Sequence, residues 1–382
     1  MNRLAALALV ALAGCPSHRT TLPVPETGGL PQQPNAPAIT WQRVESVTNV
    51  SSTPPPPGTY RIHMIDVGTG LSLLVQGHDW NLLYDAGSND SAEKPLRVVA
   101  YLERALGPSG DESCVEPGQE APAQRLHIDH VVLSHPHFDH GSALELVLHC
   151  YDVTNVWDSG SINQAAFYRN FLEAVSASAT VHYHTAASVP GDHVVGVKGA
   201  EIAIKQWDRF SEGDTVQLDA GATFTILHAD PKQHSDMNMS SIVLAVELGG
   251  ARVLLVGDAE SGPRKDPSYP AGDVEEFLLD HESKFLHADI LQVGHHGSMT
   301  SSRHSFLAAV KPHLALVSSG PKRYGRVTLP DPEVIEELQH DGATILRTDA
   351  HDGDCTLIHR IGGDSGPGGC DSYIITIEPP KK

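Results

Sequence analysis

The 382-residue chain has little positive charge and only 5% aromatic residues. It carries 26 Lys and Arg residues against 47 Asp and Glu residues, which gives a formal net charge of −21 at pH 7. A general nucleic-acid binder needs a basic surface to neutralise phosphates, so this balance disfavours that class of protein. The 40% hydrophobic content is high enough, and the 19% charged content low enough, to exclude a disordered chain. We therefore expect a folded protein with one large or two ordinary domains.

The N-terminal apolar run is short. Residues 4–12 follow the positive Arg3 and are too few to cross a bilayer as a helix, so the pattern is typical of a signal peptide. The run ends in Leu12-Ala13-Gly14-Cys15, which resembles the lipobox of bacterial lipoproteins. That resemblance implies cleavage before Cys15 and lipidation of this cysteine, with residues 1–15 as the signal. Pro16 follows, not aspartate, so we expect an exported protein anchored at the outer membrane. An ordinary secretory signal is the alternative.

Residues 16–58 are rich in Pro, Thr, Ser and Gln, and end in the four prolines 54–57. Such a segment has no apolar set from which to build a core, and we expect a polyproline-like spacer. The folded domain is then expected at residues 59–378.

Four cysteines follow this spacer, and none has the CxxC spacing of a zinc or redox motif. An even number of cysteines in an exported protein indicates two disulfides, with three possible pairings. Cys355 and Cys370 flank a glycine-rich segment between two strand-like runs, so we expect them to pair. Cys114 would then pair with Cys150. Four buried thiols are the alternative.

Strand-like runs alternate with helix-like segments through the folded region, which indicates an α/β fold. Strands are expected at 60–67, 71–75, 80–84, 130–133, 154–157, 223–227, 241–248, 252–256, 290–293, 314–318 and 344–347. Helices are expected at 95–106, 141–149, 302–310 and 332–341.

A dense group of metal-ligand residue types follows the strand at 130–133. In His135-x-His137-x-Asp139-His140, four potential ligands occupy six residues. The loop can turn its two halves apart, so that His135 and His137 hold one metal while Asp139 and His140 hold a second. Imidazole and carboxylate ligands suit zinc, and also iron or manganese. A single histidine here would fit a solvent-exposed turn equally well, but this spacing predicts a site for two divalent ions.

Several motifs, in their order and spacing, resemble the metallo-β-lactamase superfamily. The resemblance covers roughly residues 59–378 and is greatest to the branch that holds the hydrolase domain of the competence protein ComEC and a phosphorylcholine esterase. It implies a four-layer αββα sandwich with the metals at one edge of both sheets. The motifs are Ile65-Asp66-Val67-Gly68-x-Gly70, Leu83-Tyr84-Asp85-Ala86-Gly87, the histidine cluster, Leu254-Leu255-Val256-Gly257-Asp258, Val293-Gly294-His295-His296-Gly297-Ser298, Lys311-Pro312, Tyr324-Gly325 and Arg347-Thr348-Asp349.

The resemblance also implies roles for individual residues. Asp258 would bridge both metals, and Asp139 would be catalytic as well as a ligand. His296 would bind the second metal, while His295 would contact a phosphate or donate a proton. The two histidines could exchange these roles.

The third ligand of the first metal is left open. His228 ends a strand and is the first choice, with His234 and Asp158 as alternatives. Asp158 could instead accept a hydrogen bond from a ligand histidine and orient it. The resemblance implies that orienting role for Asp85, although an ordinary turn aspartate is the alternative.

Two positions depart from the related branch. Leu71 stands where that branch usually has aspartate, and Arg326 follows Gly325 where it has histidine. Lys322, Arg323 and Arg326 could pair with a phosphate, or form a solvated basic turn.

These residues together predict a metal-dependent hydrolase. Two metals lower the pKa of a shared water, which supplies hydroxide near neutral pH. No protein nucleophile is then needed, in agreement with the lack of a Gly-x-Ser-x-Gly motif. We expect a phosphoester or phosphodiester substrate, either a small molecule or a polymer. The alternatives are an extracytoplasmic nuclease of the ComEC type, disfavoured by charge, and a non-catalytic, metal-binding surface lipoprotein.

Overall fold

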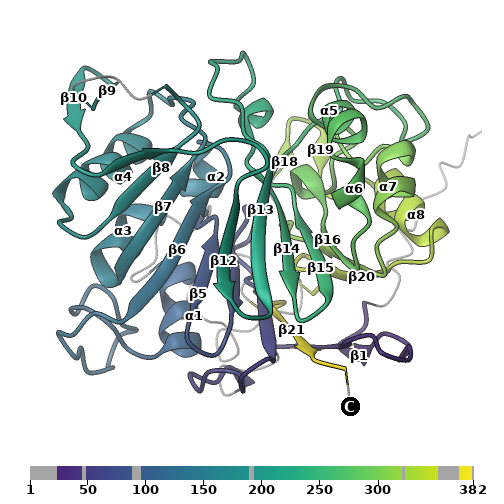
Figure 1. The fold of residues 1–382 in the computed structure, drawn as a ribbon, viewed down its shortest axis with the longest axis horizontal. Coiled ribbons are helices and arrows are strands. Elements are labelled where there is room, and N and C mark those ends of the chain that lie inside the picture. Colours follow the sequence, from purple (N-terminus) through teal and green to yellow (C-terminus); the bar gives the residue numbers. More distant parts are fainter. Residues whose placement is uncertain are drawn as a thin grey trace, which may run out of the picture.

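Two β-sheets pack face to face in the computed structural model, with helices on both outer faces (Figure 1). The structure describes residues 24–44, 49–87, 96–188, 193–320, 323–351 and 370–380. Cys15, Lys322 and Cys355 lie outside these residues, so the lipidation and the Cys355–Cys370 pairing stay predictions.

The first sheet has ten strands in the order β1-β2-β21-β3-β4-β5-β6-β7-β8-β11. In chain order the strands are β1 (Thr27–Gly29), β2 (Ala38–Arg43), β3 (Tyr60–Met64), β4 (Leu73–Gln76), β5 (Asn81–Tyr84), β6 (His127–Leu133), β7 (Asp152–Asp158), β8 (His182–Thr185), β11 (Trp207–Arg209) and β21 (Tyr373–Glu378).

The second sheet has seven strands in the order β12-β13-β14-β15-β16-β17-β20. They are β12 (Thr215–Asp219), β13 (Ala222–His228), β14 (Val243–Leu248), β15 (Ala251–Leu255), β16 (Ile290–Gln292), β17 (Leu314–Val317) and β20 (Thr344–Arg347). Two small hairpins pair β9 (Val194–Val197) with β10 (Ala200–Ala203), and β18 (Arg323–Tyr324) with β19 (Val327–Thr328).

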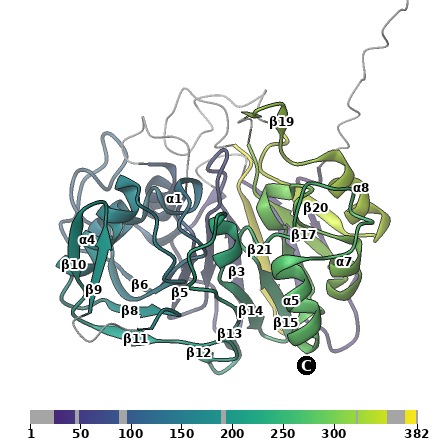
Figure 2. The same cartoon turned by 90° about the horizontal axis from the view of Figure 1, so that it is seen from above.

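Helices cover the outer face of each sheet, as Figures 1 and 2 show. Helices α1, α3 and α4 pack on the first sheet, and α5 to α8 pack on the second. The helices are α1 (Arg97–Leu106), α2 (Phe138–Gly141), α3 (Leu144–Cys150), α4 (Ala166–Ala177), α5 (Asp273–His281), α6 (Ser283–Leu286), α7 (His304–Val310) and α8 (Pro332–His340). Within the described ranges, no helix has both the length and the apolarity that crossing a bilayer requires.

Side-chain alternation along the strands produces the three apolar layers. On β4, Leu73 faces the space between the sheets while Leu74 faces the helices. On β14, Leu244 faces inward and Val243 contacts the opposite helical layer. Successive strand residues point to opposite faces, so strands buried on both sides read as continuous apolar runs. The αββα prediction is confirmed.

Strand β2 corrects the expected spacer. Residues 38–43 pair antiparallel with residues 373–378 of β21, and Ile39 and Trp41 are buried between the sheets. The spacer prediction is therefore wrong for this segment. Alternating Ile39 and Trp41 supply enough apolar surface for one strand, and the partner that makes it stable lies at the far end of the chain.

Helix α3 is tied to the segment before β6. Cys150, the last residue of the helix, forms a disulfide with Cys114, which is the pairing expected for these two cysteines.

Candidate metal centre

Polar side chains converge where strands of both sheets end. Asp85 follows β5, and His135 lies two residues after the end of β6, which runs parallel to β5. In the second sheet, Asp258 follows β15, and the His295-His296 pair follows the parallel strand β16. Parallel neighbours end at the same edge of their sheet, so these loops meet.

The backbone around Gly87 fixes the histidine loop. The N–H of Leu71 donates to Asp139 O at 3.0 Å, and the N–H of Ala86 donates to His140 O at 2.8 Å. A Cβ atom added at Gly87 would lie 1.7 Å from Asp139 O. Only glycine permits this approach, which explains the glycine of the Asp-Ala-Gly motif in physical terms.

Asp258 lies at the centre of the cluster. Its Oδ1 is 3.2 Å from His140 Nε2, and its Oδ2 is 3.6 Å from His296 Nε2. The same Oδ2 is 3.8 Å from His295 Nε2 and 4.0 Å from His135 Nε2. One carboxylate therefore faces imidazoles from both halves of the chain, which is the placement needed for a ligand shared by two ions.

Two groups of ligand atoms each lie within 4.8 Å of one another. One group is His135, His140 and Asp258; the other is Asp139, His140 and His296. His137 lies beside the first group, with its Nδ1 3.0 Å from His135 Nε2.

The donor atoms fit a metal. The Nε2 atoms of His140 and His296 and the Oδ1 of Asp258 are buried, and no described residue makes a well-aligned hydrogen bond to them, although His140 Nε2 and Asp258 Oδ1 lie 3.2 Å apart. The opposite ring nitrogens are held: His140 Nδ1 lies 2.8 Å from Asp85 Oδ2, and His296 Nδ1 lies 2.8 Å from Ser318 O. Unpaired buried polar atoms are costly, and metal-binding imidazoles usually donate their other nitrogen to such acceptors. These residues therefore fit divalent ions.

Electrostatics favour positive charge beside Asp258 and disfavour a proton on His135. Burial lowers the pKa of His135 well below its usual value, and nearby His140 lowers it further. Burial alone would raise the pKa of Asp258, but His140, His296 and His295 hold that pKa well below its usual value. Burial opposes protonation of His140, yet Asp258 and Asp85 raise its pKa well above its usual value. A cation bound at His140 Nε2 would take the place of the proton on that nitrogen beside Asp258, while Nδ1 keeps its proton toward Asp85.

His295 and His296 both have left-handed backbone angles, with φ of 46° and 53°. Such angles are uncommon outside glycine, and here they direct two successive imidazoles toward one carboxylate. His295 Nδ1 lies 2.8 Å from Glu260 Oε1 and 2.7 Å from Thr300 Oγ1, so its ring orientation is fixed.

Three polar residues of the site were given no role from the sequence, although Tyr324 stands in the Tyr324-Gly325 motif. Asn238 is buried, and its Nδ2 lies 3.3 Å from Glu260 Oε1 and 3.5 Å from His295 Nε2. Tyr324 donates to Asp139 Oδ2 at 3.0 Å. Glu260 could have been identified as a site residue because it lies two residues after Asp258 in the sequence. No motif or spacing in the sequence pointed to Asn238.

The structure places His228 outside the cluster. A register shift between Ile226 and His228 interrupts the alternation of β13. The His228 ring packs on Phe277 of α5, and its Nδ1 is 2.7 Å from Ser241 O. The assignment of His228 as the third ligand is therefore corrected. The alternative His234 pairs with Asp230 at 3.1 Å and is also outside both ligand groups.

Asp158 anchors the first sheet to helix α4. Its Oδ2 accepts hydrogen bonds from Tyr168 at 2.7 Å and Tyr183 at 2.8 Å, and its Oδ1 accepts one from the N–H of Gly160. These bonds occupy the carboxylate, so the expectation that Asp158 binds metal or orients a ligand histidine is wrong. Asp85 is the aspartate that orients a histidine, because its Oδ2 contacts His140 Nδ1. Asp85 is itself held in place by hydrogen bonds that it accepts from the N–H and the hydroxyl of Ser134.

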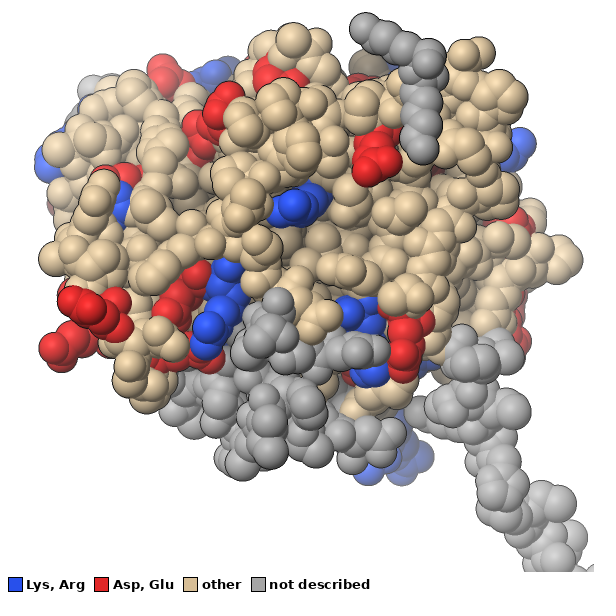
Figure 3. All heavy atoms as spheres, turned by 90° about the horizontal axis from the view of Figure 1, so that it is seen from below, with Lys and Arg blue, Asp and Glu red and all other residues tan. Residues whose placement is uncertain are grey.

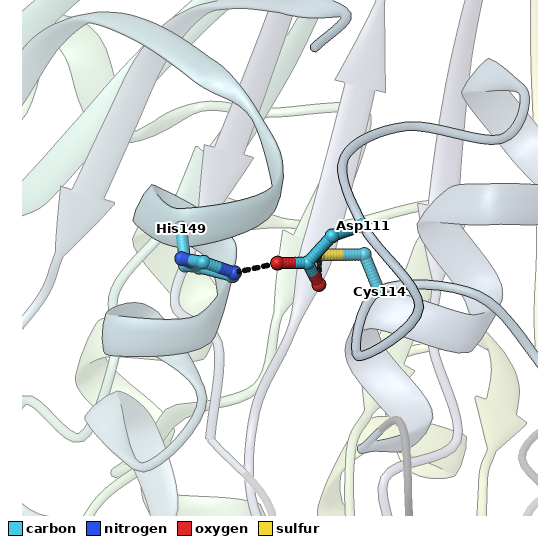
Figure 4. Close-up of side chains that lie close together, drawn as sticks. All are labelled: Asp111, Cys114 and His149. Atoms are coloured by element: carbon cyan, nitrogen blue, oxygen red, sulfur yellow. Dashed lines mark hydrogen bonds and ion pairs between the residues drawn. The ribbon is translucent and has the colours of Figure 1, made fainter. Parts of the chain in front are cut away.

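A third group of metal-ligand residue types lies on the surface. Asp111, Cys114 and His149 lie close together, and the carboxylate of Asp111 is 2.8 Å from His149 Nε2 (Figure 4). The sulfur of Cys114 is bonded to Cys150 and offers no thiolate. With Asp111 and His149 exposed, this group is an ion pair beside a disulfide.

A family model described as the metallo-beta-lactamase superfamily matches residues 65–320. This range includes every residue of the two ligand groups.

Curated relatives include recombination protein 2 of Haemophilus influenzae, which is 24% identical over 76% of this chain and 28% of its own length. Competence protein ComA of Neisseria gonorrhoeae is 27% identical over 74% of this chain and 30% of its own length. ComE operon protein 3 of Bacillus subtilis is 27% identical over 75% of this chain and 32% of its own length. The chain therefore spans about three tenths of the length of these relatives.

Among solved structures, the metallo-beta-lactamase fold protein YhfI of Bacillus subtilis aligns with a TM-score of 0.42 and 12% identity. The alignment covers 78% of this chain and 98% of that one.

Proposed function

The chain belongs to the metallo-β-lactamase superfamily, and on that premise we propose that it is a metal-dependent hydrolase of phosphoesters or phosphodiesters. The observation that carries the proposal is the position of the Asp258 carboxylate, which faces Nε2 atoms from the loop after β16 in the second sheet and from the histidine loop of the first. This arrangement supports a dinuclear site rather than a single structural ion.

We assign the first ion to His135, His137 and Asp258. The second ion is assigned to His140, His296 and Asp258, together with Asp139. We propose zinc, with iron or manganese as alternatives. Two divalent ions at these positions supply Lewis acidity and lower the pKa of a water molecule toward neutrality.

The protein side chains have separate tasks around these ions. Asp85 and the carbonyl of Ser318 hold the rings of His140 and His296 so that each Nε2 points into the site. His295 is held by Glu260 and Thr300, with its Nε2 toward Asp258. A preorganised donor at that point stabilises charge on a non-bridging oxygen of the ester. We therefore propose that His295 binds the substrate and not a metal.

The second candidate function is cleavage of nucleic acid. The names of the relatives, which refer to competence and recombination, favour it. The net charge of −21 opposes it. On the face drawn in Figure 3, the visible Lys and Arg side chains stand singly or in small groups among acidic and uncharged residues. We propose an ester substrate that does not need an extended basic surface.

We also propose that the protein is exported and lipid-anchored through Cys15 in the cell envelope. Replacing Cys15 with Ala should abolish incorporation of labelled palmitate and release the protein from membranes. Unchanged membrane retention in this variant would contradict a lipid anchor.

An assay of the purified chain with bis-p-nitrophenyl phosphate tests the main proposal. We expect hydrolysis that a chelator abolishes and added Zn²⁺, Fe²⁺ or Mn²⁺ restores. Plasmid and single-stranded DNA in the same panel test the nuclease alternative. If the chain binds metal in stoichiometric amounts but cleaves neither esters nor nucleic acid, it is a metal-binding protein and the proposed function is wrong.

A further inference from the structure

Tyr324, in the C-terminal part of the chain, lies beside the candidate metal centre. The residue lies in the β18–β19 hairpin, 185 residues from Asp139 in sequence, and its hydroxyl donates to Asp139 Oδ2 at 3.0 Å. The same carboxylate oxygen is 3.8 Å from His296 Nε2. The phenol oxygen therefore lies at the edge of the group assigned to the second ion.

Tyr324 is partly exposed to solvent, although its hydroxyl contacts the half-buried carboxylate of Asp139. Its exposed fraction is 38%, and within the described residues it is one of three large hydrophobic side chains that are exposed. A second is Phe138, with an exposed fraction of 44%, which directly precedes Asp139. The Phe138 ring packs against Phe167 of α4, with 5.5 Å between the ring centroids, whereas Tyr324 contacts the Asp139 carboxylate directly. An exposed apolar ring beside a polar cluster is a feature of ligand-binding surfaces.

A tyrosine that served only to orient Asp139 would gain stability by burying its ring, since buried aromatic surface is a main source of packing energy. Here the residue keeps an exposed fraction of 38%. Arg323, Gly325 and Arg326 are exposed as well, and neither arginine forms an ion pair with any residue that the structure describes. The hairpin therefore brings a phenol hydroxyl and a partly exposed ring to the edge of the ligand cluster, with two exposed arginines in the same turn.

We propose that Tyr324 is a substrate-contacting residue. When the phosphoester binds, the single hydroxyl proton of Tyr324 exchanges its acceptor, from Asp139 Oδ2 to an oxygen of the ester beside that carboxylate, and the partly exposed ring packs on the organic group of the ester. This inference rests on the proposed function and narrows it: the preferred substrates are phosphoesters that carry a bulky apolar or aromatic group.

The test compares Tyr324→Phe and Tyr324→Ala with Tyr269→Phe, a matched change at an exposed tyrosine elsewhere in the structure. We expect Tyr324→Phe to lower kcat/KM on bis-p-nitrophenyl phosphate about tenfold, the loss of one hydrogen bond to a charged oxygen. Tyr324→Ala should also raise KM, and more for this substrate than for methyl p-nitrophenyl phosphate, which lacks the second ring. Tyr269→Phe should match the wild type.

Two measurements that do not depend on turnover complete the test. Calorimetry should show about tenfold weaker binding of inorganic phosphate to metal-loaded Tyr324→Phe. The metal content of all variants should equal that of the wild type.

If Tyr324→Phe matches Tyr269→Phe both in kcat/KM and in phosphate binding, the inference is wrong. Metal loss in Tyr324→Phe that parallels its activity loss also overturns it, because Tyr324 would then act by holding Asp139. A wild-type protein without ester hydrolysis instead removes the proposed function.

Discussion

Asp85 and His140 form a fully buried pair, in which Asp85 Oδ2 lies 2.8 Å from His140 Nδ1. The contact joins the end of β5 to the histidine loop after β6. It also determines which ring nitrogen of His140 is free, and so directs Nε2 toward Asp258. The geometry of the proposed centre thus depends on a residue that binds no metal itself.

Replacing Asp85 with Asn should weaken metal binding. The amide keeps the size of the carboxylate and tolerates the left-handed backbone at this position, where φ is 59°. It loses the charge that holds His140, and changes of this kind typically cost about 10- to 100-fold in metal affinity. Competition with a chromogenic zinc chelator measures the effect. The control is Asp158→Asn, a buried strand-end aspartate whose loss should reduce stability by about 1–3 kcal/mol without changing zinc affinity. Equal affinities in the two variants would contradict the assignment of Asp85.

Replacing Gly87 with Ala should disrupt the histidine loop. The new methyl group would overlap the carbonyl of Asp139, so the backbone of one segment must move. We expect a loss of about 1–3 kcal/mol in unfolding free energy and a clear loss of bound metal. Gly196→Ala is the matched control, because a Cβ atom at Gly196 meets nothing within 4 Å. Urea unfolding and metal analysis give both quantities. Wild-type metal content in Gly87→Ala would show that the close approach is not required.

Replacing His228 with Gln should leave the metal content unchanged. The side chain contacts Ser241 and Phe277, so its loss should reduce stability by only about 1–2 kcal/mol. Elemental analysis of the purified variant checks the result. Loss of one metal equivalent would restore His228 as a ligand.

His63 should make the fold sensitive to mild acid. This fully buried histidine on β3 lies between Tyr101 and Gln76, and burial is the main cause that lowers its pKa to about 4. Its pKa in the unfolded chain is near 6.5, so the unfolded state takes up a proton first. Stability from this residue is complete above pH 6.5 and is lost as the pH falls toward 4. Between pH 7 and pH 5 the loss is about 2 kcal/mol.

Urea unfolding at both pH values measures this effect, with chelator present to remove the contribution of metal binding. The wild type should lose more stability between pH 7 and pH 5 than His63→Gln does. Equal losses in the two proteins would show that His63 is already protonated in the fold or is accessible to water.

The sequence was sufficient for the sandwich, and it named most of the residues that the structure brings together, because both depend on local order. Strand-length apolar runs predict the sheets, and the candidate ligands follow strands, where backbone direction brings them to one edge. His135, Asp139, His140, Asp258 and His296 all occupy such positions.

The errors concern contacts that no local pattern encodes. Strand β2 is stable because it pairs with β21, more than three hundred residues later in the chain. His228 has a favourable strand-end position, but the register shift before it turns the ring toward α5. Asp158 also lies at the end of a strand, but its carboxylate accepts hydrogen bonds from the hydroxyls of Tyr168 and Tyr183. Tyr324 reaches Asp139 only through the folding of the two halves onto each other.

The most direct test of the account is to measure metal content and hydrolysis of bis-p-nitrophenyl phosphate in the wild type and in Asp258→Ala. Asp280→Ala, at an exposed aspartate on α5, is the control. We predict two metal equivalents in the wild type and in Asp280→Ala. In Asp258→Ala we predict loss of metal and a roughly thousandfold or greater loss of kcat/KM, with the circular dichroism spectrum largely retained. Full activity in Asp258→Ala would contradict the two-metal centre.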